Sequence, residues 1–224
     1  MQEEKSKLKA VLPNPRKESF VMLVCGRRGS GKTTLVARLL LTKAAFKNKF
    51  DKIVLISPTA NLTPQWQSFD TSKWDIHTDY SPGIIVDLIS SQTRTRLWGE
   101  RPKVLVILDD MGQQTRKVKK SETDQIDILA CNGRHLDISL IQMAQVYTQI
   151  VPSVRSNADI IISYAMSSVR DQTAVYMECG CGQFKHFREQ FEAITDEKYC
   201  FMLVKNAGGR LLYHDCFTEF EMEK

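Results

Sequence analysis

The sequence predicts an α/β fold with a mainly parallel sheet flanked by helices, and two observations lead to that prediction. Short continuous apolar runs, typical of strands buried on both faces, alternate along the chain with segments of helical spacing. Apolar residues make up 42% of the 224 residues, which is enough for one sizeable core. We therefore expect a single domain over residues 19–224, preceded by a polar, basic leader over residues 1–18 that lies at the surface or is partly disordered.

The strands and helices follow in a regular order. Each predicted strand is a run of Val, Ile, Leu, Met or Phe that is too short for an ordinary helix. In each predicted helix, apolar side chains recur every three to four residues. The strands are expected at Phe20–Cys25, Lys52–Ser57, Lys103–Leu108, Ile138–Met143 and Asp159–Ser163, and the helices between them at Thr33–Phe46 and Pro82–Trp98.

The end of the chain departs from this alternation. Gln183–Ile194 has the spacing of a helix, and two later runs, Tyr199–Lys205 and Leu211–Asp215, have the composition of strands. Between the two runs, Asn206–Gly209 is typical of a hairpin turn. We expect a small C-terminal extension made of a helix and a hairpin.

Composition and charge exclude several classes of protein. The net charge of +5 allows a polyanionic partner without demanding one. No apolar run approaches the ~20 residues that cross a bilayer, and the charged N-terminus lacks the apolar core of a signal peptide. We expect an intracellular protein without membrane contact, whose six cysteines are reduced. A zinc site in the tail is the weaker alternative, because Cys179-Gly180-Cys181 does not have the spacing of known zinc-ligand pairs.

The strongest motif is Gly26-Arg27-Arg28-Gly29-Ser30-Gly31-Lys32-Thr33, which matches G-x-x-x-x-G-K-[ST] between a predicted strand and a predicted helix. Its glycines let the backbone curl, so that successive N–H groups and the helix N-terminus surround a triphosphate. Lys32 then places a positive charge on the β- and γ-phosphates, and the Thr33 hydroxyl is a ligand for Mg²⁺. The motif predicts a P-loop nucleoside triphosphatase that binds its nucleotide with Gly26 to Thr34.

Two acids end the strand predicted at Lys103–Leu108. Asp109 is the candidate Mg²⁺ ligand, and Asp110 is the candidate group that orients or deprotonates the attacking water. Many ATPases carry Glu at the second position, so the Asp110 side chain is one methylene shorter. Alone, the two acids would indicate an ordinary turn, but beside a complete phosphate loop the catalytic interpretation is favoured. The guanine-binding motif N-K-x-D is absent, which favours ATP or loose base selectivity.

Further motifs follow the phosphate loop in a recognisable order. They are Ile56-Ser57-Pro58-Thr59, Leu108-Asp109-Asp110, Gly133-Arg134-His135, Gln145 and Pro152 through Asn157. Over roughly residues 18–165, this order resembles the FtsK/HerA group of motor ATPases. Within that group it resembles the genome-packaging ATPases of poxviruses, related large DNA viruses, virophages and polinton-like elements.

The resemblance implies a RecA-like sheet, in which the strand ending near Gln145 lies between the phosphate-loop strand and the strand of Asp109. It implies that Gln145 senses the γ-phosphate, because an amide donates to a phosphate oxygen and accepts from water; an exposed glutamine without that role is the alternative. It also implies a ring in which an arginine reaches a neighbour's γ-phosphate. Arg134 is the first candidate and Arg155 the second, while Arg27 or Arg28 would act within its own subunit.

The densest basic run follows the Asp109–Asp110 strand and contains Arg116, Lys117, Lys119 and Lys120. Our hypothesis is that it lines the channel of the ring and contacts the DNA backbone without distinguishing sequences. A solvated surface loop is the alternative.

These features predict an ATP-hydrolysing motor that moves double-stranded viral DNA into a capsid. The expected cofactors are ATP and Mg²⁺, and the expected partners are double-stranded DNA, capsid proteins and further copies of the chain in a homo-oligomeric ring. We expect it in the host-cell cytoplasm, at the site of virus assembly, or in the virion. The alternatives are an ATP-dependent switch or scaffold without translocation, and a small-molecule kinase, for which the sequence has no recognisable lid.

Overall fold

The structure is a computed structural model. It describes residues 11–69, 72, 74–95, 101–111, 120–179, 184–207, 210–215 and 218–220.

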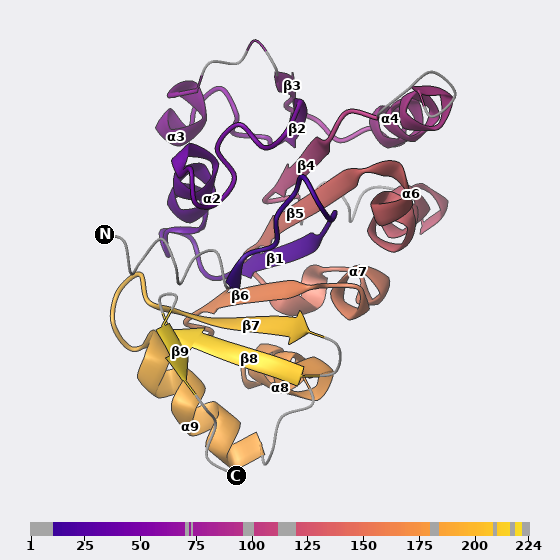
Figure 1. The fold of residues 1–224 in the computed structure, drawn as a ribbon. Helices are drawn as coiled ribbons and strands as arrows, with labels where there is room; N and C mark the ends of the chain where they lie inside the picture. The colour runs from indigo at the N-terminus through magenta and orange to yellow at the C-terminus, as the bar shows by residue number, and fades with distance from the viewer. Residues whose placement is uncertain are drawn as a thin grey trace.

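One sheet runs through the described residues, with the strand order β3-β2-β4-β5-β1-β6-β7-β8-β9 (Figure 1). The strands from β3 to β6 in that order are parallel, and β7, β8 and β9 continue the sheet with antiparallel pairing. The bounds are β1 Val21–Cys25, β2 Lys52–Ile56, β3 Trp74–His77, β4 Val104–Asp109, β5 Ile138–Ala144, β6 Ile160–Tyr164, β7 Phe201–Ala207, β8 Arg210–Asp215 and β9 Thr218–Phe220.

Helices cover both faces of the sheet (Figure 1). Side chains alternate between the faces along each strand, so Met22 and Val24 belong to one core cluster and Leu23 and Cys25 to the other. The first cluster lies under α2 (Lys32–Leu41) and α3 (Pro64–Gln67). The second lies under α4 (Pro82–Thr95), α6 (Lys120–Asn132), α7 (Pro152–Ser156), α8 (Val169–Cys179) and α9 (Phe184–Thr195), and short 3₁₀ turns, η2 (Gly133–Leu136) and η3 (Tyr147–Gln149), flank β5.

The predicted α/β fold with a mainly parallel sheet is confirmed, and each predicted strand begins and ends within two residues of an observed one. The helix predicted over Thr33–Phe46 ends earlier, at Leu41, because Thr42 has an extended backbone. The helix predicted over Pro82–Trp98 extends to Thr95, and Trp98 lies outside the described residues. The sequence did not predict β3, α3, α6, α7, α8 or β9. The strand β3 is a half-exposed edge strand of four residues, which gives no buried apolar run.

The end of the expected surface leader is part of the packed fold. Val11 and Leu12 are buried in the core cluster under α2. Arg16 forms an ion pair with Asp51, with 2.9 Å between guanidinium and carboxylate. The burial of two apolar side chains is thus enough to hold this otherwise polar segment against the core. The division into residues 1–18 and 19–224 stays a prediction.

No helix among the described residues has the length and apolar character needed to span a bilayer.

Candidate nucleotide-binding site

The phosphate-loop motif connects β1 to α2, as the sequence predicted. Gly29 and Gly31 have φ values of 76° and 101°, in the left-handed region that suits glycine. Gly26 is required for a different reason, because a Cβ there would lie 2.6 Å from the Cβ of Tyr164. Arg27 and Arg28 are exposed at the tip of the loop. The sequence therefore curls the backbone at the N-terminus of a ten-residue helix, the arrangement that binds phosphate groups.

The Lys32 ammonium group is turned toward its own loop. Its Nζ donates hydrogen bonds to the carbonyl oxygens of Gly26, at 2.6 Å, and Arg27, at 3.0 Å, and only 8% of the residue is exposed. Burial lowers the pKa of Lys32, while the negative charges of Asp110 and Asp109 oppose that shift. A phosphate group offers this ammonium a stronger, charged acceptor than the two carbonyls.

Asp109 ends β4 and is buried beside the loop. Its Oδ2 accepts a hydrogen bond from the indole Nε1 of Trp66, at 3.0 Å, and one from the Oγ of Ser57, at 3.2 Å. Burial raises the pKa of Asp109, and the hydrogen bonds from Trp66 and Ser57 oppose that shift. Both hydrogen bonds reach the same oxygen, so neutral donors fix the direction of the carboxylate.

Asp110 follows directly and is exposed, with a φ of 53°. Among non-glycine residues, Asp and Asn adopt this left-handed conformation most readily. The shorter acid at this position, where many ATPases have Glu, therefore fits the backbone. The Nε2 of Gln145 donates a hydrogen bond of 2.6 Å to the Oδ2 of Asp110.

Gln145 reaches Asp110 because of the strand order. The strand β5 lies between β1 and β4, as the sequence resemblance predicted, and that prediction is confirmed. The carboxyl ends of β1, β4 and β5 meet at one edge of the sheet, which in open α/β sheets is where ligands bind. We call this the carboxyl edge. It brings together the phosphate loop, Asp109, Asp110 and Gln145.

The sequence profile described as "Poxvirus A32 protein" matches residues 11–179. The chain belongs to this family. The resemblance to poxvirus ATPases predicted from the sequence is thereby confirmed.

Relatives of this chain occur in iridescent viruses. It is 25% identical over 206 residues to the uncharacterized protein 088R of Invertebrate iridescent virus 3, a match that covers 91% of this chain and 76% of the relative. It is also 25% identical over 211 residues to the uncharacterized protein 075L of Invertebrate iridescent virus 6, covering 89% of this chain and 78% of the relative.

Solved structures share the fold. The DNA-packaging ATPase B204 of Sulfolobus turreted icosahedral virus is 18% identical, with a TM-score of 0.62 over 90% of this chain and 98% of that one. The conjugation coupling protein TcpA of pCW3 is 14% identical, with a TM-score of 0.60 over 92% of this chain and 61% of that one. At these identities the similarity establishes the P-loop ATPase fold.

Of the candidate arginines, Arg27 and Arg28 lie in the phosphate loop itself, whereas Arg134 and Arg155 do not. Arg134 lies in η2, before β5, whereas Gln145 follows β5, so the two residues lie at opposite ends of one strand. Arg134 is exposed. With Asp159 it lines a pocket of about 430 Å³ at the amino ends of the parallel strands, which we call the amino edge. Arg155 is already engaged, in an ion pair of 2.8 Å with Glu178 and over the ring of Tyr147.

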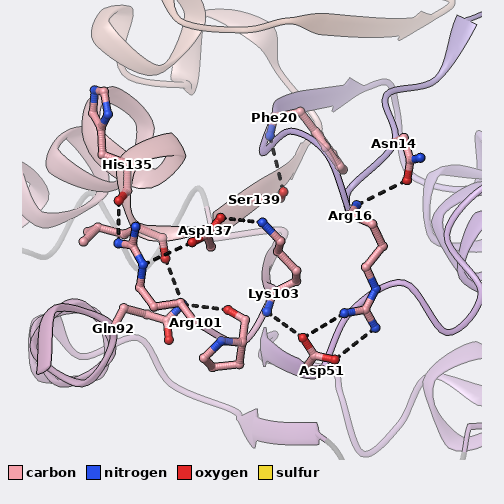
Figure 2. A network of polar contacts seen from close by, with 12 residues as sticks. Asn14, Arg16, Phe20, Asp51, Gln92, Arg101, Lys103, His135, Asp137 and Ser139 are labelled. Carbon is pink, nitrogen blue, oxygen red and sulfur yellow. Dashed lines mark hydrogen bonds and ion pairs between the residues drawn. The ribbon is translucent and has the colours of Figure 1, made fainter. Parts of the chain in front are cut away.

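A network of ion pairs and hydrogen bonds connects several segments at the amino edge, around η2 (Figure 2). The Asp137 carboxylate forms ion pairs with Lys103, at 2.5 Å, and Arg101, at 3.1 Å. Asp51 accepts a hydrogen bond from the backbone N–H of Lys103, at 2.7 Å, and pairs with Arg16. We call these five residues the amino-edge network. It ties the N-terminal segment to β2, β4 and the turn that carries Arg134.

The predicted DNA-contacting run lies almost wholly beyond the described residues. Arg116, Lys117 and Lys119 are outside them, and Lys120 is the first residue of α6, with its side chain not described.

The described cysteines, Cys25, Cys131 and Cys200, are free thiols, and burial raises the pKa of the Cys25 thiol. Within the described part of the chain, no cluster of three or more His, Cys, Asp or Glu residues has a metal-binding arrangement. Cys181 lies outside the described residues, as does the side chain of Cys179.

Sequence reasoning missed two aromatic residues at the site. Trp66 bonds Asp109 across 43 positions of sequence, from a four-residue helix. The Pro at the start of that helix is a start signal, but nothing in the sequence indicates where the indole points. Tyr199 lies beside the loop, with a ring atom 3.2 Å from the position that a Cβ on Gly31 would take.

Proposed function

We propose that this protein is an ATP-hydrolysing motor that moves double-stranded viral DNA into a capsid. One observation carries the proposal. The buried ammonium of Lys32, the strand-end carboxylates Asp109 and Asp110 and the amide of Gln145 converge at one edge of the sheet. Membership of the poxvirus A32 family supports a viral role, and the shared fold of the B204 packaging ATPase supports a packaging role. Such a protein acts where virions are assembled or within the virion.

In the proposed mechanism, the N–H groups from Gly26 to Thr34 bind the triphosphate of ATP. Lys32 exchanges its two backbone carbonyl partners for the β- and γ-phosphates. The residues present fit a Mg²⁺ ion, since Asp109 is a buried carboxylate held by neutral donors and Thr33 lies in the first turn of α2. These two residues would hold the ion, which neutralises charge on the phosphates.

Asp110 and Gln145 are the residues proposed to orient and activate the attacking water. An exposed carboxylate at the loop is suited to orient a water molecule and to accept its proton. Gln145 now donates to this carboxylate, and the same N–H group can instead donate to a γ-phosphate oxygen. We infer that nucleotide binding redirects Gln145 from Asp110 to the phosphate, which frees the carboxylate for water only when ATP is present.

A ring arrangement accounts for the position of Arg134. This exposed arginine lies at the amino edge, away from the phosphate loop of its own chain. When copies assemble head to tail, the amino edge of one chain faces the carboxyl edge of the next, and Arg134 is then the candidate that stabilises the neighbour's γ-phosphate. Arg155 is less suited, because Glu178 already neutralises it. Arg134→Ala should leave nucleotide affinity unchanged and lower turnover only in the assembled oligomer.

The decisive experiment measures ATP hydrolysis with and without long double-stranded DNA, while light scattering gives the mass of the particle. A motor is expected to hydrolyse faster with DNA, as an oligomer. Lys32→Ala is the control for contaminating activity, with an expected loss of about 1,000-fold. Hydrolysis that ignores DNA would indicate the switch or scaffold, and phosphate transfer to a small acceptor would indicate the kinase.

The contact with DNA is tested by its dependence on salt. The run containing Arg116, Lys117, Lys119 and Lys120 is proposed to neutralise backbone phosphates, so each lost charge should lower the slope of log affinity against log salt by about 0.9. We would compare Lys117→Gln/Lys119→Gln with Lys43→Gln/Lys47→Gln, which removes two exposed charges from the turn after α2. Equal slopes for the two pairs would exclude the run from the interface.

A further inference from the structure

An aromatic side chain lies uncovered beside the phosphate loop. Tyr199 is 56% exposed, although its ring reaches the loop closely enough to lie 3.2 Å from where a Cβ on Gly31 would be. Its backbone has a φ of 74°, which is unusual for a bulky residue. Packing of the ring in the core does not explain this unfavourable backbone conformation. Such unexplained conformations are expected at functional sites.

Topology places Tyr199 on a particular side of the loop. The strand β7 is antiparallel to β6 and pairs Phe201 with Tyr164, the last residue of β6, so the turn before β7 lies at the carboxyl edge. In the sheet, β6 and β7 follow β1 on one side, and β5 and β4 follow on the other. The phosphate loop thus has Asp109 and Asp110 on one side and Tyr199 on the opposite side.

A bound nucleotide would extend between these two sides. Its γ-phosphate must face the carboxylates and Gln145, where hydrolysis is proposed. The α-phosphate and the nucleoside then lie toward the side of β6, which is the side of Tyr199. A base leaving the loop in that direction meets an exposed aromatic ring.

Contacts on both sides of Tyr199 fix the backbone of the turn that carries it. The backbone N–H of Cys200 donates to the carbonyl oxygen of Glu197 at 3.1 Å. The Phe201 ring packs edge-on against Tyr164, with 5.4 Å between ring centroids. The Nζ of Lys198 lies 4.9 Å from the centroid of the Tyr199 ring. A turn whose backbone is fixed before the ligand arrives loses little freedom on binding.

We propose that Tyr199 stacks on the base of the bound nucleotide and forms the base subsite. This inference rests on the proposed function, because it assumes that the loop binds a nucleoside triphosphate. Every base has a π-face, so stacking favours the larger purine rings and distinguishes poorly between adenine and guanine. The absence of the N-K-x-D guanine motif agrees with a subsite of this kind.

The test is calorimetric titration of the ligand-free protein with two probes, AMPPCP and inorganic tripolyphosphate, each with Mg²⁺. Tyr199→Ala should weaken AMPPCP binding about tenfold and leave tripolyphosphate binding unchanged. Tyr199→Phe and Tyr199→Trp keep an aromatic face and should bind AMPPCP within about twofold of the unmodified protein. Met177→Ala is the matched control. It removes an exposed apolar side chain from α8, away from the turn of Tyr199 in the sequence, and should change neither affinity.

The possible failures are distinguishable. Unchanged AMPPCP affinity in Tyr199→Ala overturns the base subsite and leaves the proposed function intact. Equal weakening of both probes also overturns it, because the ring would then shape the loop instead of binding the base. If the unmodified protein binds neither probe, both proposals fail. Tyr199→Gly suits the left-handed backbone and supplies a folded variant without the ring, which thermal unfolding would verify.

Discussion

The charged side chains at the two edges of the parallel sheet have different kinds of partner. At the amino edge, Asp137 and Asp51 meet cationic partners, and the resulting pairs join segments that are far apart in the sequence (Figure 2). At the carboxyl edge, the hydrogen bonds described for Lys32 go to backbone carbonyls, and those described for Asp109 come from an indole and a hydroxyl.

Stability and function are divided between the two edges. Paired charges at the amino edge hold the scaffold in position. At the carboxyl edge, burial works against the charged forms of both Lys32 and Asp109, which is unfavourable until a ligand of complementary charge arrives. Substitutions at the carboxyl edge should therefore change activity most, and substitutions within the amino-edge network should change stability most.

After the loss expected for Lys32→Ala, the largest effect on turnover is expected for Asp110→Asn. The amide keeps the left-handed backbone but is a poor proton acceptor, so ATP turnover should fall about 100-fold while AMPPCP affinity stays unchanged. Single-turnover hydrolysis and calorimetry would measure the two quantities. Asp110→Glu keeps the charge and lengthens the side chain, and it should be intermediate in turnover. Wild-type turnover in Asp110→Asn would remove this residue from the mechanism.

A smaller effect is expected for Trp66→Phe, which deletes the N–H group that bonds Asp109. With Ser57 as the remaining donor among the described residues, the carboxylate is less well oriented. The Mg²⁺ concentration for half-maximal ATPase activity should rise about tenfold, with little change at saturating Mg²⁺. Trp74→Phe is the control, because its ring lies 6.1 Å from that of Trp66 in the same aromatic cluster. A lower rate at saturating Mg²⁺ would contradict a purely orienting role.

At the amino edge, Asp137→Asn should lower stability without altering the nucleotide site. The change removes the charge shared by Lys103 and Arg101 and keeps a residue that tolerates the φ of 57°. The free energy of unfolding in urea should fall by about 1–2 kcal/mol, with a smaller loss at high salt. AMPPCP affinity should stay within about twofold, and a larger loss would show that the two edges are coupled.

The smallest expected effect is a gain in stability, produced by Asp109→Asn. Burial raises the pKa of Asp109, so the folded protein binds the proton more tightly than the unfolded chain, and it loses stability as the pH rises through the unfolded and then the folded pKa. Asp109→Asn escapes this loss. The ligand-free variant should melt about 2–4 °C higher at pH 7, and the gain should vanish below pH 4, about where the unfolded carboxyl is protonated. A lower melting temperature at pH 7 would contradict the interpretation.

The sequence was most informative where a residue type has one structural use. The glycines of the phosphate loop and the apolar runs predicted the loop, its strand and most of the sheet. The position of β5 between β1 and β4 was predicted from the resemblance, which combines many motifs. The function of the individual site residues stays a prediction that the variants above test.

The rest was not predictable because it depends on side chains that meet only after folding. The bond between Trp66 and Asp109 and the ion pair between Arg16 and Asp51 join residues on different elements. Polar spacing along the chain does not encode such contacts. Tyr199 gave no signal either, because an aromatic residue before a hairpin strand usually belongs to the core.

The strand β5 has a mechanical consequence. It carries the Arg134 turn at one end and Gln145 at the other, and Leu140 to Met143 are hydrogen-bonded in register to both neighbouring strands. Seven extended residues make a rod of about 23 Å that cannot slide without breaking bonds on both sides at once. In the proposed ring, a displacement of the Arg134 turn by a neighbouring copy would therefore be transmitted along β5 to Gln145, at the site proposed to hydrolyse ATP.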